Sequence, residues 1–332
     1  MTLPTRWLGR TGVRVSTLAL GCMSFGGDAD AATSAALYAQ ARDAGVTLFD
    51  TADVYNDGRS EELVGRLTAG HADEVVVATK AYFPTGPDGN ARGTSRYHLV
   101  RACEASLRRL GRDHVDIYYL HRWDDRTALD ETLRALDDLV TAGKVLYPAC
   151  SNFAAWQVAH ALGAAATARL RPLVAVQPMY NLLKRQAEVE LLPMAAALGV
   201  AVVPYSPTAG GLLTGKWGQA RRPDAGRMTT NPMYQARYAD PAYLAAADGL
   251  VAIAAELGVH PAALAVAWVA GHPAVTSVLL GARSPAQLAQ LLTAGTIAMT
   301  DELRGRLAAL TPTPPPATDR SEERTAATYG SR

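Results

Sequence analysis

The sequence is poor in cysteine, and the cysteines it has are far apart. They are Cys22, Cys103 and Cys150, and no two of them form a Cys-x-x-Cys pair. This excludes a disulfide framework or a cysteine zinc site as the organising element of the fold. It is typical of a reducing compartment, so we expect a cytoplasmic protein. The N-terminal segment MTLPTRWLGRTG contains no apolar run, and we expect no signal peptide.

Charge of one sign and long apolar runs are also missing. Lysine and arginine total 32, and aspartate and glutamate total 31, a formal net charge of +1. Such a balance gives no strong basic field for nucleic acid. No stretch approaches the roughly 18 apolar residues of a membrane span. With 49% hydrophobic residues, the 332-residue chain is typical of a folded protein with a large core. We expect neither nucleic acid nor a membrane among its partners.

What the chain does contain is an alternation of short β-branched runs with longer runs rich in alanine and leucine. Continuous apolar runs such as residues 75–78 suit strands that are buried on both faces, as in parallel sheets. We expect eight such strands, at residues 17–20, 46–50, 74–79, 115–120, 145–150, 173–177, 200–204 and 276–280.

Helical patterns fill the intervals, and four of them end at a glycine, the usual residue after a helix. These four cover residues 31–44, 95–110, 127–142 and 188–198. Eight strand–helix repeats predict an α/β protein with the (β/α)8 TIM barrel fold. The alternative is an open doubly wound sheet, whose dinucleotide-binding form requires a Gly-x-Gly-x-x-Gly motif after an early strand. The sequence has no such motif.

We expect one barrel domain over residues 1–310, with two additions to the repeat. Residues 6–15 predict a short β-hairpin ahead of the first barrel strand, placed to cover one mouth. Residues 216–241 form a long polar segment, and long loops in compact domains are usually functional. The tail, residues 311–332, is rich in proline and charge, and we expect it to be mobile or draped over the surface.

Four polar residues at or just after consecutive strand ends form a chemically intelligible set, since reactive groups in such barrels lie at the C-terminal strand ends. They are Asp50, Tyr55, Lys80 and His121. A tyrosine hydroxyl is a poor acid at neutral pH, and a nearby ammonium is expected to lower its pKa. Asp50 would hold that ammonium, and His121 would orient a carbonyl oxygen. Such a set supplies a proton to an oxygen that becomes an alkoxide, as hydride reduction of an aldehyde or ketone requires.

The motifs around these residues resemble those of the aldo-keto reductase superfamily, and more narrowly its bacterial branch, which also includes potassium-channel β subunits. The resemblance runs from about residue 6 to about residue 310. It rests on RWLGRTGVRVSTLALGCMSFGG, DTADVY, ATK, YLHR, GKVLYPACSNF, QPMYNLL, YSPTAGGLLTGK and GARSPAQL. It implies an NADP-dependent oxidoreductase in which Asp50, Tyr55, Lys80 and His121 are the catalytic tetrad and Tyr55 is the general acid.

The resemblance also implies where NADPH or NADP+ is bound. The nicotinamide carboxamide contacts fall on Ser151, Asn152 and Gln177, and the ring-stacking aromatic falls on Tyr205. Arg283 stands just before a predicted helix, and a helix N-terminus beside an arginine suits a phosphate, which favours NADPH over NADH. The full set of implied cofactor contacts is Gly21, Met23, Asp50, Ser151, Asn152, Gln177, Tyr205, Ser206, Pro207, Gly210, Lys216, Arg227, Gly281, Arg283 and Gln287.

Three positions depart from the family pattern. Pro148 lies in a segment that usually reads Ile-Gly-Val or Ile-Gly-Ala, so we expect a local distortion of that strand. Thr208 replaces the usual leucine after Ser-Pro. Leu291 replaces an asparagine that usually bonds adenine, and we expect looser adenine recognition.

Other motifs favour structural interpretations. Residues 210–216 match Gly-x-x-x-x-Gly-Lys, but Trp217 stands where a nucleotide-binding loop needs serine or threonine. Trp156 and Trp268 lie in apolar helical runs and are expected in the core. We expect no metal, because no metal-ligand spacing relates His98, His114, His160 and His260.

We therefore expect an NADPH-dependent enzyme that reduces a small carbonyl substrate, as a monomer or homo-oligomer. Two alternatives remain open: an NADPH-binding regulatory subunit with slow turnover, and a reductase of a sugar-nucleotide or secondary-metabolite intermediate. The expected substrate contacts are Tyr55, His121, Phe25, Tyr82 and Trp123, with Met23, Val54, Phe83 and loop 216–241 around them. This mixture of aromatic and apolar groups accepts too many carbonyls to select one.

Overall fold

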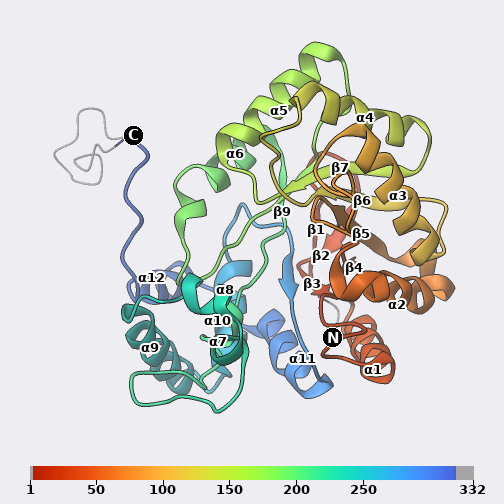
Figure 1. The fold of residues 1–332 in the computed structure, drawn as a ribbon. Coiled ribbons are helices and arrows are strands. Elements are labelled where there is room, and N and C mark those ends of the chain that lie inside the picture. The colour runs from red at the N-terminus through yellow and green to blue at the C-terminus, as the bar shows by residue number, and fades with distance from the viewer. Residues whose placement is uncertain (1–2, 319–332) are drawn as a thin grey trace.

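Eight strands lie parallel in one sheet of the computed structural model, which describes residues 3–318 (Figure 1). Their order is β10-β3-β4-β5-β6-β7-β8-β9. All eight expected strands are present, and one of them, β6, has the bounds that its apolar run predicts. The strands are β3 (Leu18–Gly21), β4 (Leu48–Asp50), β5 (Val76–Ala81), β6 (Val115–Leu120), β7 (Val145–Ser151), β8 (Ala175–Gln177), β9 (Ala201–Val202) and β10 (Val278–Leu280).

The two edges of this sheet meet, which closes it into a barrel. The Thr276 amide donates to the Val202 carbonyl at 2.8 Å, and the Leu279 amide donates to the Pro204 carbonyl at 3.0 Å. These bonds join β9 to β10, so the sheet has no free edge between its first and last strands. The (β/α)8 fold is confirmed, and the open doubly wound sheet is excluded.

Helices surround the barrel in the alternation that the sequence predicts (Figure 1). The glycines that follow them end them as expected: Gly111 and Gly199 adopt φ values of 61° and 71°, in the left-handed region where glycine is favoured. The α-helices are α1 (Ala31–Asp43), α2 (Arg59–Thr68), α3 (Arg96–Leu110), α4 (Leu129–Thr141), α5 (Ala155–Ala168), α6 (Leu191–Leu198), α7 (Arg227–Thr230), α8 (Pro232–Arg237), α9 (Ala242–Glu256), α10 (Pro261–Ala270), α11 (Pro285–Leu292) and α12 (Asp301–Ala308).

An antiparallel hairpin covers the N-terminal end of the barrel. It consists of β1 (Thr5–Trp7) and β2 (Arg14–Ser16). Leu8 and Val15 are fully buried and belong to the same apolar cluster as the side chains that fill the barrel interior, such as Tyr119. The predicted hairpin is therefore confirmed, and it seals the end of the barrel opposite to the carboxyl ends of the strands.

The strand at Pro148 is not distorted. β7 runs without interruption through Pro148, which pairs with Tyr118 of β6. On its other side the Pro148 carbonyl accepts a hydrogen bond from the Val174 amide at 2.9 Å. Since β8 begins only at Ala175, the missing N–H of the proline faces a position before the ladder between β7 and β8 begins. The expected distortion was wrong for this reason.

The two tryptophans expected in the core differ. Trp268 of α10 is fully buried, as expected, whereas Trp156 of α5 is 62% exposed and lies with its ring 5.6 Å from that of Trp123. α5 is apolar on nearly every side, so its sequence carries no polar face to indicate which residues turn outward. The expectation for Trp156 was wrong.

The predicted loop at 216–241 contains the two short helices α7 and α8, and it lies at the side of the barrel where α9 and α10 pack (Figure 1). Among the described residues no single helix is long and apolar enough to cross a membrane; α9 and α10 pass that test only as a pair, bent by 97°. Of the tail, residues 311–318 are described and only Thr311 among them is buried. The rest of the expectation for the tail, on residues 319–332, lies outside the described part of the chain.

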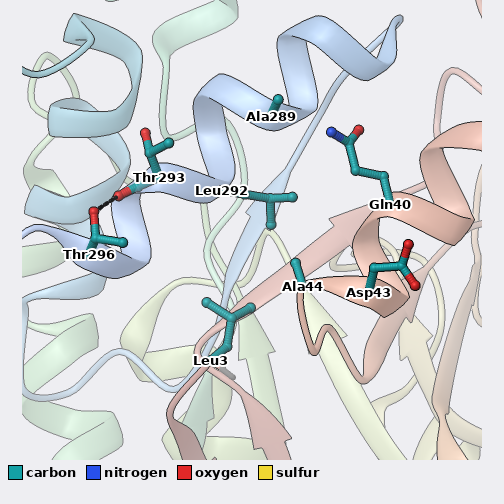
Figure 2. Close-up of a pocket in the computed structure, with 8 residues that line it drawn as sticks. All are labelled: Leu3, Gln40, Asp43, Ala44, Ala289, Leu292, Thr293 and Thr296. Carbon is teal, nitrogen blue, oxygen red and sulfur yellow. Dashed lines mark hydrogen bonds between the residues drawn. The ribbon is translucent and has the colours of Figure 1, made fainter. Parts of the chain in front are cut away.

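A small hollow of about 340 Å³ lies between α1, α11 and the N-terminal segment. Figure 2 shows the residues that line it. Leu3, which lines it, lies with Leu18 against Gly295, so the hollow is near the start of β3. That is the end of the barrel that the hairpin covers. Asp43 is the one titratable side chain of its lining.

Candidate active site

Three neighbouring strands bring the predicted catalytic residues to one rim of the barrel. Asp50 ends β4, Lys80 is the next-to-last residue of β5, and His121 directly follows β6. Their side chains are nearly or fully buried, at 3%, 0% and 8% exposure. Tyr55 begins the 3₁₀ turn after β4. All four therefore lie at the carboxyl ends of the strands, as the barrel fold requires of reactive groups.

Lys80 is the centre of this group. Its Nζ donates to Asp50 Oδ1 and, at 2.7 Å, to the Thr51 carbonyl, and it lies 3.4 Å from Tyr55 Oη. Gln177 Nε2 donates to the other Asp50 oxygen at 2.8 Å. Burial lowers the pKa of Lys80, but Asp50 and Tyr55 raise it by more, so the pKa lies above its ordinary value. Lys80 is thus a fixed ammonium aimed at the tyrosine hydroxyl.

The pKa of Tyr55 differs from the sequence expectation. Burial raises it, and although Lys80 opposes this shift, the pKa stays above its ordinary value. The loss of water around Tyr55 destabilises its charged tyrosinate form. This effect is larger than the stabilisation that the Lys80 ammonium, 3.4 Å away, provides. The expected net lowering was wrong. Tyr55 therefore holds its proton at neutral pH, as a proton donor must.

His121 completes the rim as a neutral imidazole. Burial, with a smaller contribution from the Lys80 charge, holds its pKa well below the usual range. Its ring lies 5.9 Å from the ring of Tyr55, and its Nδ1 is buried with no hydrogen-bond partner among the described residues. The His121 carbonyl accepts from Asn152 Nδ2 at 3.0 Å. Asn152 adopts a φ of 58°, a costly conformation for a residue other than glycine.

A cavity of about 930 Å³ opens above these residues. Tyr55, His121 and Asp50 line it, whereas Lys80 lies beneath the surface. Every position to which the resemblance assigns a cofactor contact also lines it. These are Gly21, Met23, Asp50, Ser151, Asn152, Gln177, Tyr205, Ser206, Pro207, Gly210, Lys216, Arg227, Gly281, Arg283 and Gln287.

Three of the expected substrate contacts do not line this cavity. Phe25 is fully buried in the hydrophobic core. Tyr82 packs edge-on against Phe83, with ring centroids 5.3 Å apart, and it is Phe83 that faces the cavity. Trp123 lies 5.2 Å from the ring of Phe153, and its Nε1 donates to Asp125 at 2.7 Å. Strand-end position alone does not fix the direction of a side chain in the following loop, and the expectations for Phe25, Tyr82 and Trp123 are corrected accordingly.

A family model described as the aldo/keto reductase family matches residues 17–311. The chain belongs to this family. The uncharacterized oxidoreductase YrpG of Bacillus subtilis is 39% identical over 322 residues, which cover 93% of this chain and 96% of the relative. A probable voltage-gated potassium channel subunit beta of Arabidopsis thaliana is 37% identical, covering 85% of this chain and 88% of the relative. The versiconal hemiacetal acetate reductase of Aspergillus parasiticus is 31% identical, covering 80% and 85%.

In this aldo/keto reductase the side chains of the cofactor positions fit a dinucleotide that carries phosphates. Ser284 caps the N-terminus of α11, and the neighbouring Arg283 exposes its guanidinium beside it. Arg283 Nη1 lies 3.5 Å from Asp28 Oδ2, and both side chains are exposed. Such an ion pair is weak, so a bound phosphate can take the place of Asp28. At the other end of the cavity Tyr205 donates to Asn152 Oδ1 at 2.7 Å, which orients its ring beside the catalytic rim.

Several residues of the cavity were missed by the sequence analysis. Tyr234 is buried in α8, and its hydroxyl accepts from Arg227 Nη1 at 3.2 Å. Arg122 and Arg237 line the cavity as well. Arg122 directly follows His121, so its position in YLHR was a usable signal. Arg237 and Tyr234 lie in the long segment 216–241, whose importance was predicted but whose individual contacts carried no sequence signal.

Proposed function

We propose that this protein reduces an aldehyde or ketone to the alcohol with NADPH, and that Tyr55 gives the proton to the carbonyl oxygen. One observation carries the proposal. The Tyr55 hydroxyl lines the cavity and lies 3.4 Å from the buried ammonium of Lys80. A bound nicotinamide supplies the hydride. The four residues of the tetrad supply the proton, from Tyr55, and hold the reacting groups in position.

Each member of the tetrad has a distinct part in this proposal. Tyr55 stays protonated until negative charge develops on the carbonyl oxygen. The Lys80 ammonium then stabilises the tyrosinate that remains. Asp50 keeps Lys80 charged and in place, and neutral His121 donates a hydrogen bond to the carbonyl oxygen without introducing a second positive charge.

The test of the proton donor is Tyr55→Phe. This change removes the hydroxyl and keeps the ring, so kcat is expected to fall about 10²–10⁴-fold, the usual contribution of general acid catalysis. NADPH affinity, measured by fluorescence titration, is expected to stay within about twofold. The assay is NADPH absorbance with a panel of aldehydes and ketones. A variant that keeps more than half of the wild-type kcat would sink the assignment. Tyr147→Phe, a partly exposed tyrosine of β7 outside the cavity, is the matched control.

The preference for NADPH is proposed to rest on Arg283. Charge-assisted hydrogen bonds to the 2′-phosphate contribute about 1.5–3 kcal/mol each, and NADH lacks that phosphate. Arg283→Ala is therefore expected to weaken NADPH binding about tenfold or more and to leave NADH binding nearly unchanged. Fluorescence titrations with both cofactors decide this. Equal weakening of both cofactors, or a wild type that uses them equally, contradicts the role of Arg283.

A second function is favoured by the relatives that are called potassium channel subunits. In this alternative the protein binds NADPH, turns over slowly and regulates a partner. The same substrate panel separates the two functions. Turnover with a kcat near 1 s⁻¹ or higher supports the enzyme. Negligible turnover together with tight NADPH binding supports the regulatory subunit. We place either function in the cytoplasm, because Cys22, Cys103 and Cys150 are all free thiols.

A further inference from the structure

The cavity carries more positive charge than the proposed cofactor contacts use. Five basic side chains line it, and Asp50, already paired with Lys80, is the one carboxylate of its described lining. Three of the five, Lys216, Arg227 and Arg283, are among the proposed cofactor contacts. The two basic side chains left without an assignment are Arg122 and Arg237.

Arg237 is held in place without an acidic partner. It is the last residue of α8, and its guanidinium carbon lies 5.2 Å from the centre of the buried Tyr234 ring. The guanidinium carbon of Arg227 lies 5.4 Å from the same ring. Among the described residues no carboxylate forms an ion pair with either arginine or with Arg122. Two like charges on one ring repel each other, and a bound anion would offset that repulsion.

Arg237 lines the same cavity as Tyr205, Tyr55 and His121. Its charge lowers the pKa of the Tyr205 hydroxyl, in opposition to the larger effect of burial. Tyr205 donates to Asn152, and Asn152 in turn bonds the carbonyl of His121. Arg122, which is exposed, is the residue directly after His121. Arg122 therefore neighbours a member of the tetrad along the chain, and Arg237 shares the cavity with that residue, whereas the Arg283 site is at the N-terminus of α11.

We propose that Arg237, with Arg122, binds an anionic group of the carbonyl substrate, a carboxylate or a phosphate, while the carbonyl faces Tyr55. The planar guanidinium matches both anions. The inference rests on the proposed carbonyl reduction and sharpens it, because it selects negatively charged aldehydes and ketones from the many that an aromatic pocket accepts. Arg237 is here a specificity-determining residue.

The experiment compares carbonyls that differ in charge. The carboxylate arm uses 4-carboxybenzaldehyde and its uncharged methyl ester, and the phosphate arm uses glyceraldehyde 3-phosphate and glyceraldehyde. In the wild type kcat/KM is expected to favour the charged member of at least one pair about ten- to a hundredfold, mainly through KM, as one charge-assisted hydrogen bond gives. The arm with the larger ratio identifies the anion. The ratio is expected to fall as salt is raised.

Arg237→Gln is expected to reduce this ratio to within a few-fold of one, and Arg237→Lys is expected to restore part of it. Arg126→Gln, an exposed arginine of the same loop as Arg122 but outside the cavity lining, is the matched control and is expected to keep the ratio. Equal kcat/KM within both pairs in the wild type overturns the inference. The inference is also overturned if Arg237→Gln weakens NADPH binding but leaves the kcat/KM ratio of charged to uncharged substrate unchanged. Arg237 would then bind the cofactor.

A binding readout separates this inference from the proposed function. Calorimetric titration of 4-(hydroxymethyl)benzoate or glycerol 3-phosphate into the complex with NADP+ reports anion binding without turnover. Binding that Arg237→Gln weakens about tenfold, in a protein that reduces none of the aldehydes, supports the anion site and rejects the reductase. Turnover of the uncharged aldehydes, with neither anion bound, supports the reductase and rejects the anion site.

Discussion

Two tyrosines of this protein lie beside a cation and yet differ in what their hydroxyl groups contact. Tyr55 Oη lies 3.4 Å from Lys80 Nζ and faces the cavity. Tyr180 Oη accepts from Arg304 Nη2 at 3.0 Å and donates to Glu188 Oε1 at 2.7 Å. The Tyr180 hydroxyl is fully used within the protein, whereas the Tyr55 hydroxyl has no acceptor among the described residues. Both tyrosines have a neighbouring cation. They differ in whether the hydroxyl hydrogen is already donated to an acceptor within the described protein.

The setting of Tyr180 explains its structural part. Glu188 also pairs with Arg185, with Nη2 at 2.9 Å from the carboxylate, and Arg304 Nη1 donates to the Trp268 carbonyl at 2.6 Å. This network ties the segment after β8 to α10 and α12. Burial raises the pKa of Tyr180 far above its ordinary value, with Glu188 adding to the effect, so its proton is unavailable. The comparison predicts that changes near Tyr55 lower the rate and changes near Tyr180 lower the stability.

The largest expected effect is that of Lys80→Met on the rate. In the proposed reaction the loss of the ammonium leaves the forming tyrosinate unstabilised, so kcat is expected to fall about 10²–10⁴-fold. NADPH absorbance measures it. Because the variant leaves Asp50 buried and unpaired, the double variant Lys80→Met with Asp50→Asn controls for lost stability. A double variant that is stable and fully active would contradict the role of Lys80 in the rate, and with it the proposed difference between Tyr55 and Tyr180.

A smaller effect, now on stability, is expected from Glu188→Gln. The change keeps the shape of the side chain and removes the charge that Arg185 and Tyr180 share, so the free energy of unfolding is expected to fall by about 2–3 kcal/mol. Urea denaturation measures this, and kcat is expected to stay within twofold of the wild type. Glu190→Gln, at an exposed position with no side-chain cap bond, is the matched control. If kcat falls instead, the network is part of the catalytic machinery.

The last expected effect is a pH dependence of stability in the same network. Burial, helped by the Arg304 charge, lowers the pKa of His272 from 6.5 to about 4. Its Nδ1 accepts from the Ala274 amide at 3.2 Å, which protonation of that nitrogen would prevent. The unfolded chain therefore binds a proton at higher pH than the folded protein does. Stability is expected to fall as the pH drops from 6.5 to about 4, and to fall less in His272→Gln. Urea midpoints across this range that run parallel for the two proteins would contradict it.

The sequence carried enough information to predict the barrel and the rim at which the four candidate catalytic residues meet, because both follow from periodicity. Continuous apolar runs located the strands, and strand ends located Asp50, Lys80 and His121. Closure between β9 and β10 follows from the same repeat, and the hairpin follows from its own turn pattern. The net sign of the Tyr55 pKa shift was missed, since it depends on how much water burial removes, which no spacing encodes.

The side chains that the sequence placed wrongly are those whose direction depends on tertiary packing. Phe25 turns into the core, and Trp156 turns outward from an Ala-rich helix without a polar face. Arg237, on which the sequence analysis made no prediction, reaches the cavity from a segment with no periodic pattern of its own and stacks on Tyr234. For Phe25 and Trp156 the backbone position is predictable, whereas the direction of the side chain is set by contacts between residues far apart in the sequence.

The hairpin at the N-terminal end of the barrel limits the routes by which ligands reach the cavity. Leu8 and Val15 close that end without any exposed surface, and Lys80 is fully buried between the hairpin and the cavity. The cavity therefore opens at the carboxyl end of the strands and is closed at the other end. In the proposed reaction, cofactor, substrate and product would share the same opening, so the molecule bound deeper would bind first and leave last. The proton that restores Tyr55 in that reaction would also come through the opening, because the opposite end is filled with apolar side chains.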